Sequence, residues 1–372
     1  MEIYFAPMEG ITGYIYRNAF HDYFTGVDKY FTPFLSPNQN RALNPKEIRD
    51  VLPENNKGMH VVPQILTNRA DYFLRAAEEL KEKYGYGEVN LNLGCPSRTV
   101  VSKGKGAGFL AKPEELDSFF REVFHNIKGQ MSVKARIGVD DSKQFCHLMD
   151  IFNQYPLCEL IIHPRIQKDY YGNSPDWEVF GEVVHVSSIP LCYNGDIFTL
   201  EDYRRMKAAF PEVKRIMLGR GLLMNPMLAE EIKKEEAGTG KAEETGTRKA
   251  EEAGTGRAEE AGTRRAEEAG TGKADAAGRG KEYESGKADG PQIEKMAGEA
   301  AVMDKKRLKG FHDRLYNDYK VVMSGEKNVL FKMKEFWVYA GNLFPGEEKQ
   351  LKKIKKASRA GEYESAVEAI LA

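Results

Sequence analysis

The 372-residue chain carries 55 Lys and Arg against 56 Asp and Glu, so its formal net charge is −1 and its pI is about 6.7. This balance excludes a protein that binds polyanions over its whole surface and leaves room only for a local basic patch. No run reaches the ~20 apolar residues of a membrane span, the four cysteines lack metal-ligand spacing, and the chain opens without a signal peptide. We therefore expect no membrane span, no metal site, and a reducing, cytoplasmic location.

Short apolar runs rich in β-forming residues alternate with helical patterns over residues 1–234. In Ala70–Tyr84, large or apolar side chains recur every four residues, and Pro113–Phe124 opens with a proline and two acids, as helices do. Alternation of this kind predicts parallel strands joined by helices, and eight units in this length fit a (β/α)8 TIM barrel better than an open sheet. The eight runs are Ile3–Phe5, Tyr30–Pro33, His60–Ile65, Val89–Leu93, Ser132–Arg136, Leu160–His163, Pro190–Tyr193 and Arg215–Leu218.

The composition changes after residue 234. Lys241–Gly280 consists of five eight-residue repeats of the type KAEEAGTG, which lack large apolar side chains. Such a segment cannot bury enough surface to offset its ordering entropy, so we expect 235–300 to be mainly a disordered linker.

A helical pattern returns in 301–372, most clearly in Asn328–Phe344. These residues include 15 Lys and Arg against 10 Asp and Glu, and "KQLKKIKK" (Lys349–Lys356) is the densest basic stretch. We expect a small C-terminal helical domain. Its charge fits either an ordinary solvated helix face or a surface that faces nucleic acid.

Unusual polar residues gather at the carboxyl ends of the predicted strands, where TIM barrels place their chemistry. Each of these residues can also have a purely structural role. Lys134 can be a paired core lysine, and Asn194-Gly195 can be a simple turn. The agreement of seven strand ends favours a site. These ends carry Ala6–Gly10, Gln64, Asn90 to Pro96 with Asn92 and Cys95, Lys134 with Arg136, His163–Arg165, Asn194–Asp196 and Gly219–Gly221.

The last two strand ends have the residues of a phosphate site. Asn194-Gly195-Asp196 and Gly219-Arg220-Gly221 offer close backbone approach and a cation, which barrels often use after strands seven and eight. A phosphate there, with Lys134 and Gln64 deeper in the mouth, suits flavin mononucleotide (FMN). In contrast, "KGKGAG" (Lys103–Gly108) lacks the ending of a phosphate loop, and we expect a flexible basic loop instead.

Together these motifs resemble the tRNA-dihydrouridine synthase family over residues 3–225. The matching stretches are "APMEGIT", "VPQI", "LNLGCPSRTVVSKGKGAG", "VKARIG", "IHPRIQKDYYGNSPDW", "YNGDI" and "MLGRG", and the C-terminal helical segment resembles the family's tRNA-binding domain more weakly. Two features depart from the family pattern. Asn90 stands where members commonly carry an aspartate, and the long repeat insert separates the barrel from the C-terminal helical segment.

The resemblance implies an FMN-dependent oxidoreductase that acts on tRNA with NADPH or NADH as reductant and without a metal. It implies that Cys95 is the catalytic acid, and that Asn92, Arg136 and Tyr170 or Tyr171 lie near the uracil. It also implies that the cofactor is surrounded by Pro7, Met8, Glu9, Gln64, Lys134, His163, Asn194, Gly195, Asp196, Gly219 and Arg220. A monomer is the default expectation.

Cys95 sits between a glycine and a proline at a strand exit, and its protonation state decides its chemistry. A free thiol has a pKa near ~8.5 and is mostly protonated at neutral pH, as a proton donor should be. The neighbouring Arg98 and Lys103 leave a reactive thiolate open as an alternative.

Two rival functions follow from the same residues. A flavin barrel that acts on a free small molecule would share the phosphate loops, but the basic helical segment argues against it. A non-catalytic RNA-binding protein could keep the barrel as a scaffold, but it would not need Cys95, Lys134, His163 and Arg220. The sequence does not report which tRNA uridine would be reduced.

Overall fold

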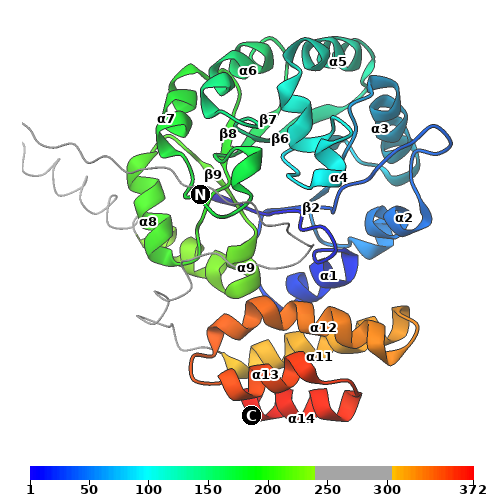
Figure 1. Cartoon of the computed structure of the whole chain (residues 1–372), viewed down its shortest axis with the longest axis vertical. Coiled ribbons are helices and arrows are strands. Elements are labelled where there is room, and N and C mark those ends of the chain that lie inside the picture. The colour runs from blue at the N-terminus through cyan, green and yellow to red at the C-terminus, as the bar shows by residue number, and fades with distance from the viewer. Residues whose placement is uncertain (239–303) are drawn as a thin grey trace, which may run out of the picture.

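Nine parallel strands form one sheet in the computed structural model, which describes residues 1–238 and 304–372 (Figure 1). Their order in the sheet is β3-β2-β1-β9-β8-β7-β6-β5-β4. The strands are β1 (Glu2–Phe5), β2 (Lys29–Phe31), β3 (Val61–Val62), β4 (Gln64–Ile65), β5 (Glu88–Leu93), β6 (Gln130–Arg136), β7 (Glu159–His163), β8 (Leu191–Tyr193) and β9 (Arg215–Leu218).

The third predicted run is divided at Pro63, because proline has no N–H to donate to a ladder. β3 pairs with β2 and β4 pairs with β5, so the two edges of the sheet are joined within one short stretch of chain. The Pro63 carbonyl still accepts from the Asn90 N–H at 2.9 Å. The sheet thus closes on itself, and the predicted TIM barrel is confirmed, with one of its eight runs divided into two short strands.

Helices follow most strands and cover the outside of the barrel (Figure 1). The two helices predicted at Ala70–Tyr84 and Pro113–Phe124 are confirmed. α3 has the predicted bounds, and α5 ends two residues later than predicted. The barrel helices are α1 (Tyr14–Tyr23), α2 (Pro45–Val51), α3 (Ala70–Tyr84), α4 (Arg98–Val101), α5 (Pro113–Asn126), α6 (Phe145–Phe152), α7 (Trp177–Val186), α8 (Leu200–Ala209) and α9 (Arg220–Met224).

Residues 228–238 are also helical, so this helix extends four residues past the predicted barrel boundary at 234, into the segment expected to be mainly a disordered linker. Glu236 in this helix forms an ion pair with the N-terminal ammonium group at 3.0 Å, which ties both ends of the barrel chain together. The repeats of Lys241–Gly280 lie outside the described residues. Within 1–238 and 304–372, no helix is long and apolar enough to span a membrane, and no cluster of His, Cys, Asp and Glu could hold a metal ion.

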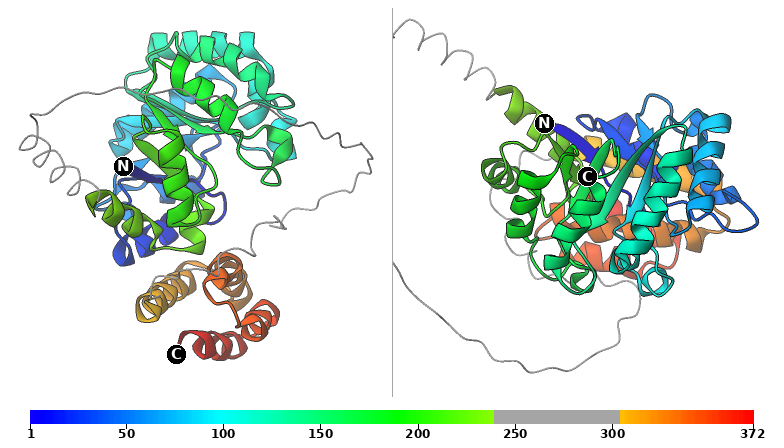
Figure 2. Two further views of the ribbon diagram at one scale, coloured as in Figure 1. Left: turned by 90° about the vertical axis from the view of Figure 1, so that its left-hand side faces the viewer. Right: turned by 90° about the horizontal axis from the view of Figure 1, so that it is seen from above.

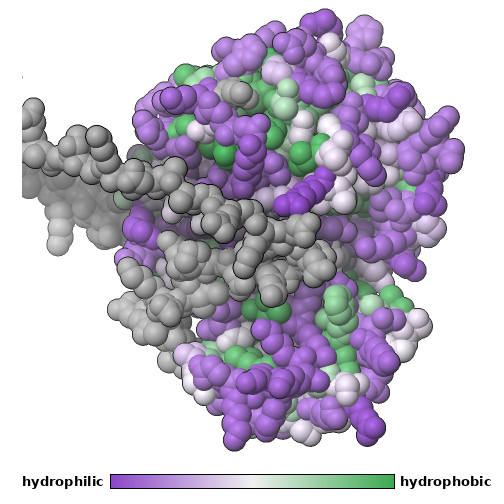
Figure 3. Space-filling view, viewed as in Figure 1, coloured by the Kyte–Doolittle hydropathy of each residue, from purple (hydrophilic) through white to green (hydrophobic). Residues whose placement is uncertain are grey.

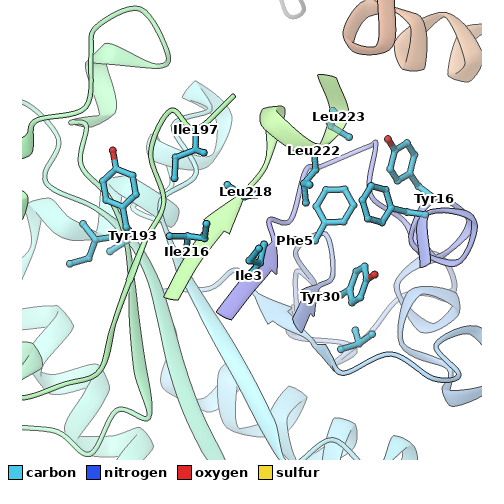
Figure 4. Packing of buried hydrophobic residues seen from close by; sticks show 14 of the residues in the cluster. Ile3, Phe5, Tyr16, Tyr30, Tyr193, Ile197, Ile216, Leu218, Leu222 and Leu223 are labelled. Atoms are coloured by element: carbon cyan, nitrogen blue, oxygen red, sulfur yellow. The ribbon is translucent and has the colours of Figure 1, made fainter. Parts of the chain in front are cut away.

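Alternation along the strands divides the core into two layers. One set of side chains fills the inside of the barrel, while the alternate set, such as Ile3 and Phe5 of β1, packs outward against helices such as α1 (Figure 4). The inner set contains Tyr4, Ala6, Phe31, Val62, Ile161, Cys192 and Met217. The interior is therefore a filled core, and any ligand has to bind at the barrel's end.

The C-terminal helical domain lies on one side of the barrel, next to α1 (Figure 2). Its helices are α11 (Lys305–Val322), α12 (Glu326–Ala340), α13 (Glu348–Lys356) and α14 (Ala360–Leu371).

Phe311 of α11 forms the apolar centre of the contact between the two domains. Its ring is fully buried and makes edge-on contacts with Tyr16, Phe20 and Phe24 at centroid distances of 5.1–6.2 Å. Two ion pairs flank this contact, Arg307 with Glu230 and Arg314 with Asp22. An aromatic centre with charged edges holds the helical domain in one orientation on the barrel.

We predict that Phe311→Ala lowers the free energy of unfolding by about 3–5 kcal/mol, as for other large-to-small substitutions in a core. Urea unfolding followed by fluorescence measures the change. The matched control is Phe331→Ala, because Phe331 of α12 is 68% exposed; it should change stability by less than about 0.5 kcal/mol. Equal effects of the two substitutions would contradict the role given to Phe311.

Candidate active site at the barrel mouth

Asn92 of β5 shapes the loop that carries Cys95. Its Oδ1 accepts from the backbone N–H groups of Gly94 and Cys95 at 3.0 and 2.9 Å. Gly106, at φ +56°, packs so closely on this loop that a Cβ would lie 2.9 Å from the Cys95 carbonyl oxygen. Packing therefore requires glycine at position 106, and also at 108, where a Cβ would lie 2.7 Å from the Val101 carbonyl oxygen. The expectation of a flexible loop is corrected for residues 106–108, which are buried against the Cys95 loop, whereas Lys103 is exposed.

The thiol of Cys95 is held in its protonated form. Burial raises its pKa, and nearby Glu9 adds to this effect. The Ser97 backbone N–H and the cations Arg136 and Lys134 act in the opposite direction but do not outweigh burial. Of the two protonation states considered above, burial of Cys95 favours the proton-bearing thiol over the thiolate.

Four cationic side chains surround the buried ring of His163. Burial lowers the His163 pKa well below its ordinary value, and Arg136, Lys134, Arg165 and Arg220 lower it further. Burial together with Arg136 also brings the pKa of Lys134 down to about 8. The Lys134 ammonium makes no hydrogen bond or ion pair with any residue in the described parts of the chain. The mouth is therefore rich in positive charge and suited to an anionic ligand.

Asp196 organises part of this cation cluster. Its carboxylate accepts from the Arg165 guanidinium through both oxygens and from Arg220 Nη2 at 2.6 Å. Arg165 Nη1 also donates to His163 Nε2 at 2.9 Å, which fixes a neutral imidazole with its proton on Nδ1. Arg165, 1% exposed, belongs to the "HPR" at the end of the sixth run and joins the residues that the resemblance implies around the cofactor.

The two predicted phosphate loops pack directly against each other. A Cβ on Gly221 would lie 2.2 Å from the Ile197 carbonyl oxygen, and one on Gly195 would overlap the Tyr193 ring. Glycine is therefore obligatory at both positions for steric reasons.

The same pair of loops meets the loop after β1. The Asn194 side chain donates to the Met217 carbonyl at 2.7 Å and ties β8 to β9. A Cβ on Gly219 would lie 3.3 Å from Met8 Sδ, so the Pro7–Glu9 loop borders the phosphate loops. Glu9 lies farther out, with its side chain 48% exposed and its Oε1 4.0 Å from Lys46 Nζ.

Arg136, Tyr170 and Tyr171, which are predicted to lie near the uracil, make different contacts in the structure. Arg136 donates to the carbonyl oxygens of Gly94, Ile166 and Tyr170 at 3.1, 2.8 and 2.6 Å, so it holds two loops in place. Tyr170, at φ +48°, is the one non-glycine residue with positive φ in the described chain. It lines a hollow of about 460 Å³ beside the mouth, together with Arg98, Val101, Ser102, Gln167 and Lys168.

Tyr171 lies over the mouth itself. Its ring centroid is 4.5 Å from the Arg220 guanidinium, 5.4 Å from that of Arg136 and 5.9 Å from the His163 ring. Of the two candidates, Tyr171 is therefore the one placed among the predicted cofactor residues, and Tyr170 faces the neighbouring hollow.

The helical domain also borders the mouth, a contact that no sequence pattern predicts. Lys332 of α12 donates to the Gly10 carbonyl at 2.5 Å. Tyr339 of the same helix has a raised pKa because of burial, with Tyr171 as the next cause. Lys332 and Gly10 are 322 positions apart in the chain, so no local pattern could have announced their contact.

Comparison with known proteins places this chain in a family. The model described as "Dihydrouridine synthase (Dus)" matches residues 4–271. A tRNA-dihydrouridine(16) synthase of Aquipseudomonas alcaligenes is 29% identical over 64% of this chain and 77% of its own, and one of Neisseria meningitidis serogroup B is 28% identical over 63% and 72%. Among solved structures, an old yellow enzyme homologue from Zymomonas mobilis aligns with a TM-score of 0.45 and 11% identity over 63% of this chain and 88% of its own.

The raised pKa of Cys95 predicts slow alkylation at neutral pH. Iodoacetamide reacts with the thiolate, so the alkylation rate should rise through a midpoint above the ordinary pKa of about 8.5. Peptide mass spectrometry of the Cys95 peptide measures the rate at each pH, and the Cys95→Ser variant gives the background from the other three cysteines. A midpoint below about pH 8 would mean that the cations dominate and the thiolate form prevails.

Proposed function

The chain belongs to the tRNA-dihydrouridine synthase family, and on that premise we propose that it reduces the 5,6 double bond of uridine in tRNA with FMN and NAD(P)H, with Cys95 as the proton donor. The observation that carries this proposal is the Cys95 loop, which Asn92 and Arg136 hold beside a cation-rich barrel mouth. Both relatives described above are, by name, synthases for position 16, so position 16 is where we propose to look first.

The residues of the mouth fit an anionic flavin. Lys134 brings an ammonium group without a partner among the described residues, and Gln64 brings a buried side-chain amide. The loops of Asn194–Asp196 and Gly219–Arg220 would hold the phosphate, with the Arg220 guanidinium supplying a cation from the second loop. When bound and reduced by NAD(P)H, FMN would supply a hydride for the uracil ring.

The remaining chemistry belongs to this chain's residues. A hydride added to one carbon of the 5,6 bond must be matched by a proton on the other, and Cys95 Sγ–H carries that proton at neutral pH. Asn92 aims the thiol by holding the Gly94 and Cys95 N–H groups. Arg136 holds the same loop from its carbonyl side. Tyr171 lies where it can stack on a base that enters the mouth.

A uridine in folded RNA has to leave its stack to reach this site. The helical domain is the candidate RNA surface, because α13 carries a run of basic residues, of which Lys349, Lys352, Lys353, Lys355 and Lys356 are exposed. Figure 3 shows the side of the helical domain that carries α13 and α14 as mainly hydrophilic. Since α12 touches the Gly10 loop, RNA bound there would lie next to the barrel mouth. An enzyme for free small molecules would have no use for this arrangement.

Cys95→Ala should leave FMN bound and lower dihydrouridine formation by about 100-fold or more, the usual contribution of a positioned acid. Mass spectrometry of tRNA after a timed reaction measures the product, and the position of the modified uridine is read from the same fragments. Cys146→Ala is the matched control, because Cys146 is exposed on α6. Activity of Cys95→Ala equal to that of the control would refute the assignment.

The pair Lys352→Gln/Lys356→Gln should weaken tRNA binding. It should also reduce the slope of log K against log salt by up to about 0.9 for each phosphate that is no longer neutralised. Filter binding at several salt concentrations measures both quantities. The control is Lys83→Gln/Lys128→Gln, which removes the same charge next to the amino ends of β5 and β6, away from the mouth. If both pairs weaken binding equally, α13 has no specific part in holding RNA.

A further inference from the structure

A string of hydrogen bonds, buried at its centre and part-buried at both ends, runs along the inside of the barrel from its base to Cys95. Four of its members, Gln64, Asn90, Asn92 and Ser132, are at most 7% exposed. Lys29 Nζ donates to Glu88 Oε2 at the base, and Ser132 Oγ donates to Glu88 Oε1. The bonds continue from Asn90 Nδ2 to Ser132 Oγ, from Gln64 Nε2 to Asn90 Oδ1, from Asn92 Nδ2 to Gln64 Oε1, and from the Gly94 and Cys95 N–H groups to Asn92 Oδ1, at 2.7–3.0 Å.

Both ends of this string dictate the same direction of donation. The Glu88 carboxylate can only accept, so Ser132 must donate to it and must accept from the NH2 of Asn90. At the other end, backbone N–H groups can only donate, so Asn92 must present its oxygen to Cys95 and its NH2 to Gln64. Working inward from either end, Gln64 must turn its oxygen to Asn92 and its NH2 to Asn90. The orientation of all three amides is therefore fixed by groups outside them.

We infer that Glu88, Ser132 and Asn90 are positioning residues for the reaction, acting on Gln64 and the Cys95 loop from the base of the barrel. The flavin part of this inference rests on the proposed function. Glu88 lies four residues before Asn92 on β5, about 13 Å at the usual rise of a strand. The string carries its donor–acceptor polarity over that distance, and it leaves the second N–H of Gln64 free to meet an acceptor on a ligand.

Asn90 has a specific place in this device. An aspartate there could accept from both Gln64 and Ser132, and the single hydroxyl hydrogen of Ser132 would then have two carboxylates to satisfy. With Glu88 present, an amide at position 90 lets every hydrogen bond between Glu88, Ser132, residue 90 and Gln64 form. This explains physically why Asn stands where the family resemblance leads one to expect Asp.

The isosteric variant Glu88→Gln tests the string at its remote end. Lys29 would keep the oxygen of the new amide, so the NH2 of that amide would meet Ser132, and the Ser132 hydrogen would have to turn to Asn90. The Asn90 amide would then have to turn its oxygen to Ser132, and the Gln64 amide would have to turn its oxygen to Asn90. The NH2 of Gln64 would therefore face the NH2 of Asn92, and these two donors cannot bond to each other. Adding Asn90→Asp removes the conflict, because the carboxylate introduced at position 90 accepts from both Ser132 and Gln64 and returns Gln64 to its original direction.

The experiment compares the wild type, E88Q, N90D and E88Q/N90D, with two readouts. FMN titration of the apoprotein should show binding about tenfold weaker in E88Q, as expected for one missing buried hydrogen bond. Binding should stay within about twofold of wild type in N90D, where the carboxylate at position 90 still accepts from Gln64, and in the double variant. Urea unfolding of the same apoproteins should show a matching recovery in the double variant. Glu2→Gln is the control, because Glu2 is also at the barrel base but outside the string, and it should bind FMN as the wild type does.

The possible results separate the two proposals. Wild-type FMN affinity in E88Q, even with lowered stability, would make Glu88 merely structural and overturn the inference. A double variant no better than E88Q in either readout would also overturn it, because the string requires the two sites to compensate. A wild-type protein that binds no flavin would instead refute the proposed function, while compensation in the unfolding data would still decide whether the string exists.

Discussion

The guanidinium of Arg136 holds the barrel mouth in shape, because it binds three backbone carbonyls from two different loops. It joins Gly94, one residue before Cys95, to Ile166 and Tyr170 on the loop after β7. A charged group that is 1% exposed would be costly without these bonds. Its charge also acts at a distance, since it helps to lower the pKa values of Lys134 and His163.

The concentration of positive charge at the mouth has an energetic consequence. Cations that lower one another's pKa are less stable together than apart, so an anion bound among them should stabilise the fold as well as fill the site. Asp196 relieves part of the repulsion by bridging Arg165 and Arg220, whereas Lys134 has no such partner in the described chain. The arrangement is one in which ligand binding and folding support each other.

Much of the barrel could be predicted because its signals are local, whereas the pairings across strands and domains could not. Strand runs, helix periodicity and polar residues at strand ends are read within a few positions, and they placed Gln64, Lys134 and His163 at one end of the barrel. The division of the third strand follows from the chemistry of proline but not from apolar periodicity. Lys332 meets Gly10 only because α11 docks on α1 through its buried aromatic ring, an interface between residues on either side of 239–303.

The polar string shows a further limit of reading residues one at a time. Ser132 and Glu88 look unremarkable in sequence, one a small polar residue in a strand and the other an acid at a strand's start. Their importance comes from register, because Asn90 faces both Ser132 and Gln64 on adjacent strands. Hydrogen bonds between such neighbours have a direction, and a direction can be passed along a chain of amides without any atom moving far. A buried polar network can thus specify the orientation of a mouth residue from the opposite end of a barrel, which an apolar core cannot do.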